Sequence, residues 1–97
     1  MVIVYEDVEA IAADREVDFA VVVTPPNVRM DVLEPLCAAG KHILLEKPIA
    51  RTAQEALKIV ELCENCGSTL GIVLQHRMRL ASRKAQALVR SGELGDL

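Results

Sequence analysis

One turn in the sequence carries an ammonium where a buried strand is expected to end. Lys47 stands between Glu46 and Pro48, and Glu46 directly follows the apolar residues 43–45. Burying an unpaired ammonium is costly, so a lysine at this place is expected to do more than decorate the surface. Glu46 alternates to the opposite side of the strand and cannot easily pair with Lys47. Pro48 holds Lys47 extended and permits a cis peptide bond, which would fix the direction of the ammonium. We therefore interpret this turn as functional.

A second turn, Thr24-Pro25-Pro26-Asn27, follows another apolar run. Two consecutive prolines keep the backbone extended and remove two amide donors. The Thr24 hydroxyl and the backbone carbonyls are then the polar groups that face a ligand. From local sequence alone a structural interpretation is favoured, in which the turn is stiff and Asn27 caps the next helix.

A third polar group, Gln75-His76-Arg77, follows the apolar run that ends near residue 74. It begins a basic segment, and such a segment is usually the solvated face of a helix. The same segment could also meet an anionic ligand. His42 stands at the start of an expected strand, at the opposite edge of the sheet from these groups, and we interpret it as structural.

The elements that must position these turns follow from alternation along the chain. Apolar runs recur at residues 2–5, 19–24, 42–46 and 69–75, and a helical segment follows each. This order predicts an α/β fold with a parallel sheet and flanking helices. The middle runs are continuously apolar, which predicts strands covered by helices on both faces. Open parallel sheets bind ligands beyond the carboxyl ends of their strands, where the three turns are expected to lie.

Helix boundaries are marked by capping signals. Thr52 and Glu55 match a capping box, in which each side chain bonds a free backbone amide of the other. Gly67 lies just beyond the end of the helix that they begin. The predicted apolar face of this helix consists of Ala53, Ala56, Leu57, Val60 and Cys63.

Two further helices are predicted on either side of that one. The earlier one ends at Gly40 and contains Pro35, which predicts a kink or a shortened first turn. The later one extends from Leu80 to Arg90 and ends at Ser91-Gly92. The predicted apolar stripe of the earlier helix consists of Val28, Val32, Leu36 and Ala39.

Composition narrows the class of protein. The 97 residues form one small domain at most, with 52% hydrophobic and 26% charged residues. A net charge of -3 with one Tyr and one Phe argues against nucleic-acid binding. We expect no membrane contact and a cytoplasmic location, since the apolar runs are short and the N-terminus is unlike a signal peptide. The three cysteines are expected to be free thiols, and the Cys63/Cys66 pair to be structural rather than a redox or metal site.

Four segments together resemble a known family. They are residues 17–25, 39–48, 75–77 and 91–95, of which residues 40–48 are the most specific. They resemble the Gfo/Idh/MocA family of NAD(P)-dependent oxidoreductases, whose namesakes are glucose-fructose oxidoreductase and inositol dehydrogenase. The resemblance extends over essentially the whole chain. It implies a partial Rossmann (dinucleotide-binding) fold, NAD or NADP as cofactor, and hydride transfer with a sugar, polyol or related hydroxyl or carbonyl substrate.

The resemblance also implies roles for individual residues. In the family, the Thr-Pro and Glu-Lys-Pro turns line the nicotinamide pocket. By analogy Lys47, the candidate catalytic residue, would polarise or protonate the substrate oxygen, while Glu46 and Thr24 help to position the cofactor. Arg29 is a departure, because the family usually carries His at that position, five residues after the Thr. The implied cofactor-binding residues are Thr24, Pro25, Asn27, Glu46, Lys47, Pro48, Gln75 and Arg77, with no metal site.

The sequence contains no GxGxxG motif. In the family that loop precedes the region seen here, and a substrate domain would begin near Leu94 to Leu97. We therefore expect residues 1–97 to form a single partial NAD(P)-binding Rossmann domain without the glycine-rich first βαβ unit and without the C-terminal substrate domain. Such a chain is expected to bind NAD(P) weakly or not at all and to be inactive alone.

The same resemblance implies an open sheet edge. In the strand order 3-2-1-4-5-6, residues 19–24 are strand 4, which would normally pair with strand 1. With strand 1 absent from the sequence, this edge is expected to recruit a second copy and form a homo-oligomer.

Two other interpretations differ in class. A response-regulator receiver also has a strand that ends in Lys-Pro, but it needs a phosphoacceptor Asp at the end of an upstream strand. Here that strand ends in Thr24-Pro25, so we do not favour a receiver. The closer alternative is a truncated Rossmann fragment that folds and self-associates without catalysing a reaction.

Overall fold

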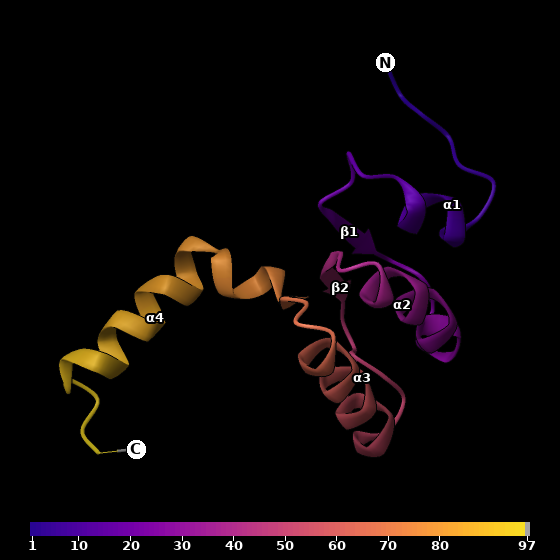
Figure 1. The fold of residues 1–97 in the computed structure, drawn as a ribbon. Helices are drawn as coiled ribbons and strands as arrows, with labels where there is room; N and C mark the ends of the chain where they lie inside the picture. Colours follow the sequence, from indigo (N-terminus) through magenta and orange to yellow (C-terminus); the bar gives the residue numbers. More distant parts are fainter. Residues whose placement is uncertain (97) are drawn as a thin grey trace.

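The computed structural model describes residues 1–96. Its centre is a three-stranded parallel sheet in the order β1-β2-β3, formed by Phe19–Val22, His42–Glu46 and Leu70–Val73 (Figure 1). Helix α2 (Arg29–Ala38) connects the first two strands, and helix α3 (Ala53–Asn65) connects the last two. The predicted class, α/β with a parallel sheet and flanking helices, is confirmed. Each strand lies within the apolar run that predicted it.

The N-terminal apolar run, residues 2–5, forms no strand, so the prediction of a strand there is wrong. Val2 is 88% exposed, and the residues beside it are exposed as well. β1 pairs with β2 alone, and residues 2–5 do not pair with its free edge. A side-chain hydrogen bond ties it to the fold, from the Tyr5 hydroxyl to the Asp14 carboxylate just beyond α1 (Val8–Ala13). That bond lowers the pKa of Asp14.

Helix α2 buries a different stripe from the predicted one. A 3-10 turn, Pro26–Val28, precedes the helix, and Val28 itself is exposed. Both stripes have helical spacing, so periodicity alone does not distinguish them. The helix continues through Pro35 for most of another turn, and the chain then leaves it at Gly40 with a φ of 74°. The stripe that faces the core consists of Arg29, Leu33, Leu36 and Cys37.

Helix α3 begins at the predicted cap. Thr52 Oγ1 accepts a hydrogen bond from the Glu55 amide at 3.2 Å. The Glu55 carboxylate accepts from the Arg51 amide at 3.1 Å and from the Arg51 guanidinium at 2.7 Å, so the reciprocal bond reaches one residue further back than a capping box predicts. These bonds lower the pKa of Glu55, and the largest contribution comes from the Arg51 side chain.

Of the residues predicted for the buried face of α3, Cys63 is fully buried. Ile59 and Cys63 are buried, whereas Leu57, which the predicted stripe included, is exposed. Ile59 and Cys63 lie four residues apart and so share one face, which packs against α2 and the sheet. The helix ends before Gly67, which has a φ of 69° as a left-handed cap requires.

Helices cover one face of the sheet, not both as predicted. Ile43 and Leu45 of β2 are buried, while His42 and Leu44, which alternate with them, are exposed. Because side chains alternate along a strand, the second pair faces away from the helices. α2 lies between α1 and α3 (Figure 1). Within residues 1–96 no helix lies over the other face. The apolar residues on that face are therefore exposed, although the continuous apolar run predicted that they would be covered.

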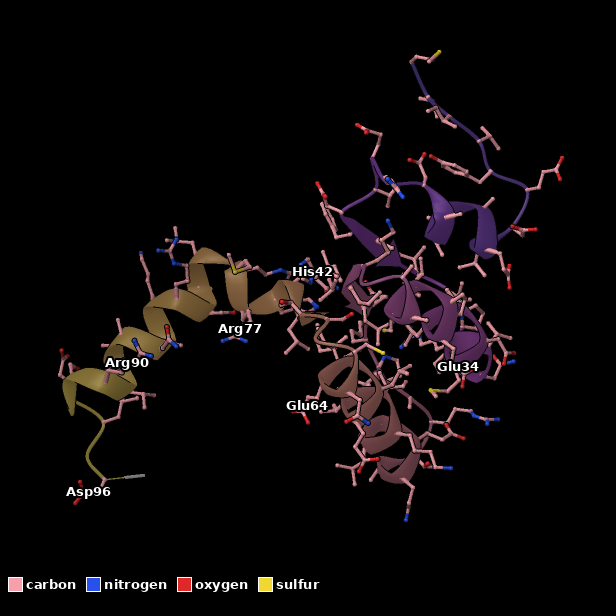
Figure 2. All side chains as sticks on the ribbon, in the orientation of Figure 1. Glu34, His42, Glu64, Arg77, Arg90 and Asp96 are labelled. Carbon is pink, nitrogen blue, oxygen red and sulfur yellow. The ribbon has the colours of Figure 1, made fainter. Side chains whose placement is uncertain are left out.

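Helix α4 (Leu80–Ser91) stands apart from the sheet and follows the 3-10 turn η2, Gln75–Met78 (Figure 1). None of its residues is buried, and Arg90 on it projects into solvent (Figure 2). The Cα radius of gyration of 17.1 Å therefore exceeds the ~13 Å typical of a compact domain of this length. The predicted end of this helix at Ser91-Gly92 is confirmed. The predicted domain start at Leu94 to Leu97 reaches residue 97, which lies outside the described residues.

The three cysteines are free, and two of them meet in the core. Cys37 Sγ and Cys63 Sγ lie 3.7 Å apart, whereas Cys66 is exposed after the end of α3. Of the Cys63/Cys66 pair, Cys63 thus lies in the core and Cys66 at the surface. Burial, followed by the neighbouring Cys37, raises the pKa of Cys63 to about 12.

We expect these thiols to differ strongly in reactivity, because only the thiolate reacts with disulfide reagents. In the native chain Cys66 should react with Ellman's reagent at once, and the other two only as fast as the chain unfolds. A raised pKa also means that the stability contributed by the neutral Cys63 thiol is present below pH 9 and is lost as the pH rises toward about 12. Three equal reaction rates at pH 8 would contradict this assignment.

Candidate functional site

The three predicted turns follow the carboxyl ends of the three strands. Thr24 comes two residues after β1, Lys47 directly after β2, and Gln75 two residues after β3. Since all strands are parallel, these ends share one edge of the sheet. The placement of the turns predicted from the sequence therefore agrees with the topology.

Lys47 is exposed at the end of the central strand, with Glu46 half-buried beside it. As predicted, the two do not pair: the ion pair present in residues 1–96 joins Arg51 and Glu55. The Lys47-Pro48 peptide bond is cis, the isomer that the sequence permits. The ammonium is thus available at the carboxyl edge of the sheet.

Thr24 lies in the neighbouring turn, and its hydroxyl is distinctive. Thr24 Oγ1 is buried and has no hydrogen-bond partner in the part of the chain that the structure describes. A buried hydroxyl without a partner is unfavourable by roughly 1–3 kcal/mol and is unusual in folded proteins. This atom can accept or donate a hydrogen bond to a ligand placed at the edge.

Asn27 does not cap the next helix, so the structural interpretation of its side chain is wrong. It lies inside the 3-10 turn Pro26–Val28, and no side chain caps either that turn or α2. It lines instead a small cavity of about 150 Å³ with Arg51, Glu55 and Lys58. The cavity separates the start of α2 from the start of α3 and contains two cationic side chains.

Arg29 connects the two turns. Its side chain is 2% exposed. The guanidinium donates to the carbonyl of Thr24 through Nε at 3.2 Å and Nη2 at 3.0 Å. Nη1 donates to the carbonyls of Pro48 and, at 3.1 Å, Ile49. Arg29 thereby fastens the backbone after β1 to the backbone after β2.

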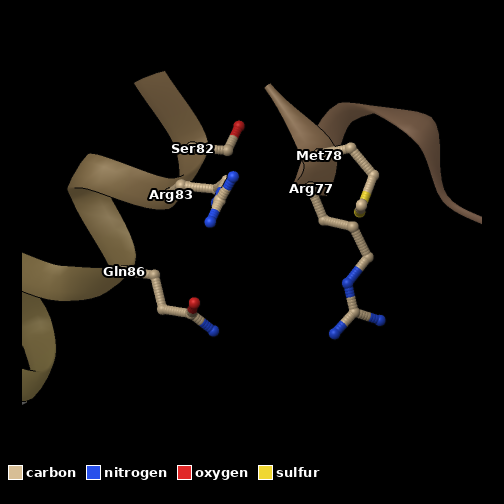
Figure 3. Close-up of a pocket in the computed structure, with 5 residues that line it drawn as sticks. All are labelled: Arg77, Met78, Ser82, Arg83 and Gln86. Carbon is tan, nitrogen blue, oxygen red and sulfur yellow. The ribbon is translucent and has the colours of Figure 1, made fainter. Parts of the chain in front are cut away.

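Gln75 and Arg77 belong to the same edge but lie in other hollows. Both line a cavity of about 320 Å³ with Leu44. Arg77 also projects into a cleft of about 560 Å³ between η2 and α4, together with Arg83 (Figure 3). The predicted basic segment thus forms an exposed, solvated cleft. These two residues form no hydrogen bond to the turns that contain Thr24 and Lys47 within residues 1–96.

His42 has the structural role predicted for it. Its Nδ1 accepts a hydrogen bond from the Thr69 amide at 3.0 Å, at the amino end of the sheet (Figure 2). Over residues 1–96 no three His, Cys, Asp or Glu side chains gather in a way that could hold a metal ion. Within the same range, none of the helices combines the length and apolarity needed to cross a bilayer.

Residues 1–73 match the GFO_IDH_MocA profile, described as an oxidoreductase family with an NAD-binding Rossmann fold. The chain belongs to the Gfo/Idh/MocA family. The match includes all three strands and the turns that contain Thr24 and Lys47. The resemblance predicted from the sequence is therefore confirmed.

Relatives in the Gfo/Idh/MocA family are considerably longer than this chain. An uncharacterized oxidoreductase of Schizosaccharomyces pombe is 32% identical over 96 residues, which are 99% of this chain and 26% of that protein. The D-xylose 1-dehydrogenase (NADP(+)) of Haloarcula marismortui is 32% identical over 94 residues, 97% of this chain and 26% of that enzyme. The chain thus spans about a quarter of the length of these relatives.

A solved structure supports the fold of this Gfo/Idh/MocA chain. The WlbA dehydrogenase of Bordetella pertussis, in complex with NADH and UDP-GlcNAcA, superimposes with a TM-score of 0.86 over 94% of this chain and 26% of that one. At 23% identity the likeness establishes the fold alone. The sheet and helices of residues 1–96 are therefore part of a Rossmann fold.

Arg29 is the residue whose importance the sequence did not reveal. It was identified only as a departure from the His usual in the family. The signal in the sequence was a single cation in the first helical turn after two prolines. Arg29 lies on the buried stripe of α2, and the predicted stripe did not include it. Which side of α2 faces the core depends on the 3-10 turn before it, and that turn was not predicted.

Proposed function

We propose that this chain forms the nicotinamide side of the cofactor site in an NAD(P)-dependent oxidoreductase acting on a sugar, polyol or related hydroxyl or carbonyl compound. The main supporting observation is that an exposed Lys47 and a buried Thr24 hydroxyl without a hydrogen-bond partner lie at the same edge of the sheet. Membership in the Gfo/Idh/MocA family supports the reaction class. The substrate class is supported by a relative named as a D-xylose dehydrogenase.

The residues at the edge fit the cofactor chemically. The Thr24 hydroxyl supplies a hydrogen-bonding group that the chain itself leaves unused. When bound, the cofactor supplies the hydride donor or acceptor at its nicotinamide ring. In the proposed role, Lys47 donates a hydrogen bond or a proton from Nζ to the substrate oxygen, which stabilises the charge that develops there. Pro25, Glu46 and Pro48 belong to the same two turns, whereas Asn27 lines the neighbouring small cavity.

Residues 1–97 contain no phosphate-binding glycine loop, so the chain is expected to hold only the nicotinamide half, and weakly. Titration of ¹⁵N-labelled chain with nicotinamide mononucleotide should shift the amide resonances of the non-proline residues in 24–27 and 46–49, with a dissociation constant in the millimolar range. Adenosine monophosphate, the other half of the cofactor, is the control and should leave them in place. An absence of shifts up to 20 mM, or equal shifts with both compounds, would rule out the proposed site.

A second proposal concerns the open edge of β1, which favours self-association. β1 pairs with β2 on one side only, so the other side presents unpaired backbone groups. A largely apolar hollow of about 290 Å³ extends along it, lined by residues of β1, α1 and α2. The non-catalytic alternative, a chain that folds and associates without catalysing a reaction, rests on this open edge.

Sedimentation at tens of micromolar is expected to show dimers or larger species. Val21→Lys places a charge on the exposed side of the edge strand and should shift the population toward monomer by tenfold or more. Leu57→Lys, on an exposed site of α3, is the matched control and should leave the association unchanged. A monomeric wild-type chain at these concentrations would eliminate the edge as an interface.

The proposal includes a cytoplasmic location. Three free thiols, two of them adjacent in the core without a disulfide, suit a reducing compartment.

A further inference from the structure

Arg29 is a buried cation without an anionic partner. No carboxylate lies within ion-pair distance of it in residues 1–96, where Arg51 and Glu55 form the ion pair. A buried guanidinium is strongly unfavourable unless its donors are satisfied. Here backbone carbonyls satisfy them, from Thr24, Pro48 and Ile49. The side chain is thus oriented entirely by the two turns of the proposed site.

Within residues 1–96, the hydrogen bonds of Arg29 are the ones that join the two turns. The pairing of β1 with β2 ends at Val22 and Leu45. Beyond these residues no backbone hydrogen bond joins the two turns in the described chain. The separation of the Thr24 carbonyl from the Pro48 carbonyl is therefore fixed by the span of one guanidinium.

We propose that Arg29 is a positioning residue, which sets the place of Lys47 relative to Thr24 by bridging the backbone on both sides of the site. Arg suits this role because its planar fork presents several donors in a fixed geometry, whereas Lys offers a single mobile centre. Its consequence for cofactor binding rests on the proposed function, but the bridge itself does not. The guanidinium touches neither cofactor nor substrate in this role.

The bridge can be tested without a ligand. Arg29→Lys keeps the charge and removes the fork. We expect the folded chain to keep its core resonances, such as those of Leu33 and Ile59. The amide resonances of Thr24, Lys47 and Ile49 should shift and broaden. Arg51→Met is the matched control. It removes a nearby exposed guanidinium that bonds only to Glu55, and the Thr24 amide resonance should not respond.

Chemical rescue distinguishes a bridge from general packing. Arg29→Ala leaves space for a guanidinium ion, so 20 mM guanidinium chloride should return the resonances of residues 47–49 toward their wild-type positions. The same concentration of methylammonium chloride should not. A structural contribution from bulk alone would show no such selectivity.

Several results would overturn the inference. One is an Arg29→Lys chain whose two turns have wild-type resonances. Another is that both variants unfold throughout and guanidinium restores neither, since Arg29 would then be an ordinary core residue. Nicotinamide mononucleotide separates this inference from the proposed function. If the compound leaves the wild-type resonances unshifted while Arg29→Lys still shifts those of both turns, the result would contradict the proposed function but support the bridging role of Arg29.

Discussion

Replacing Leu45 by alanine is expected to leave much of the chain unfolded at 25 °C. Leu45 is 0% exposed in the central strand and belongs to a core of eight buried hydrophobic residues in the described part of the chain. Truncation of a buried leucine typically costs about 2–5 kcal/mol, because the removed methyl groups leave a cavity. A domain with so small a core lies at the low end of the usual ~5–15 kcal/mol of stability. The loss is therefore comparable to the whole free energy of unfolding.

The adjacent residue provides the control. Leu44 is 37% exposed and faces the side of the sheet without helices. Leu44→Ala should reduce the free energy of unfolding by less than about 1 kcal/mol. Urea unfolding followed by circular dichroism measures both. Equal losses in the two variants would mean that helices do not cover the side of the sheet to which Leu45 is assigned.

The second large effect is expected at Lys47, in an enzyme that contains these residues together with complete cofactor and substrate sites. Lys47→Met should lower kcat for hydride transfer by about 10²–10⁴-fold, the usual contribution of a positioned acid or base. The dissociation constant for NAD(P)H should change by only a few-fold, since in the proposed role the ammonium acts on the substrate oxygen.

Lys58→Met removes an exposed ammonium from α3 and serves as the reference for a change of charge alone. Its kcat should match that of the wild type. If Lys47→Met retains wild-type kcat, or raises only the Michaelis constant for the substrate, Lys47 has no part in the chemical step.

The strands could be predicted from the sequence because burial determines them. β2 coincides with the predicted run, residues 42–46, since each of its ends borders a turn residue and its centre is apolar. Residues 2–5 carry the same apolar signal but form no strand, because a strand needs a neighbour and composition does not show whether one exists. Continuous apolarity likewise predicted two covered faces where residues 1–96 provide helices for one.

The candidate site was predictable in part for the same reason. Thr24 and Lys47 end neighbouring parallel strands, so topology alone brings them to one edge. The bridge from Arg29 was not predictable, because it depends on the rotation of α2 about its axis. A one-residue difference in where the helix begins decides whether Arg29 or Val28 faces the core. Local sequence does not resolve that difference.

The most direct test is to measure nuclear Overhauser effects between nicotinamide mononucleotide and the selectively protonated chain at millimolar concentrations. Contacts are predicted from the nicotinamide ring protons to the Thr24 methyl group and the Lys47 side chain, at the carboxyl edge of the sheet. Ring contacts to the amino edge near His42 and Thr69 instead, or none to either turn at saturation, would contradict the placement of the nicotinamide site.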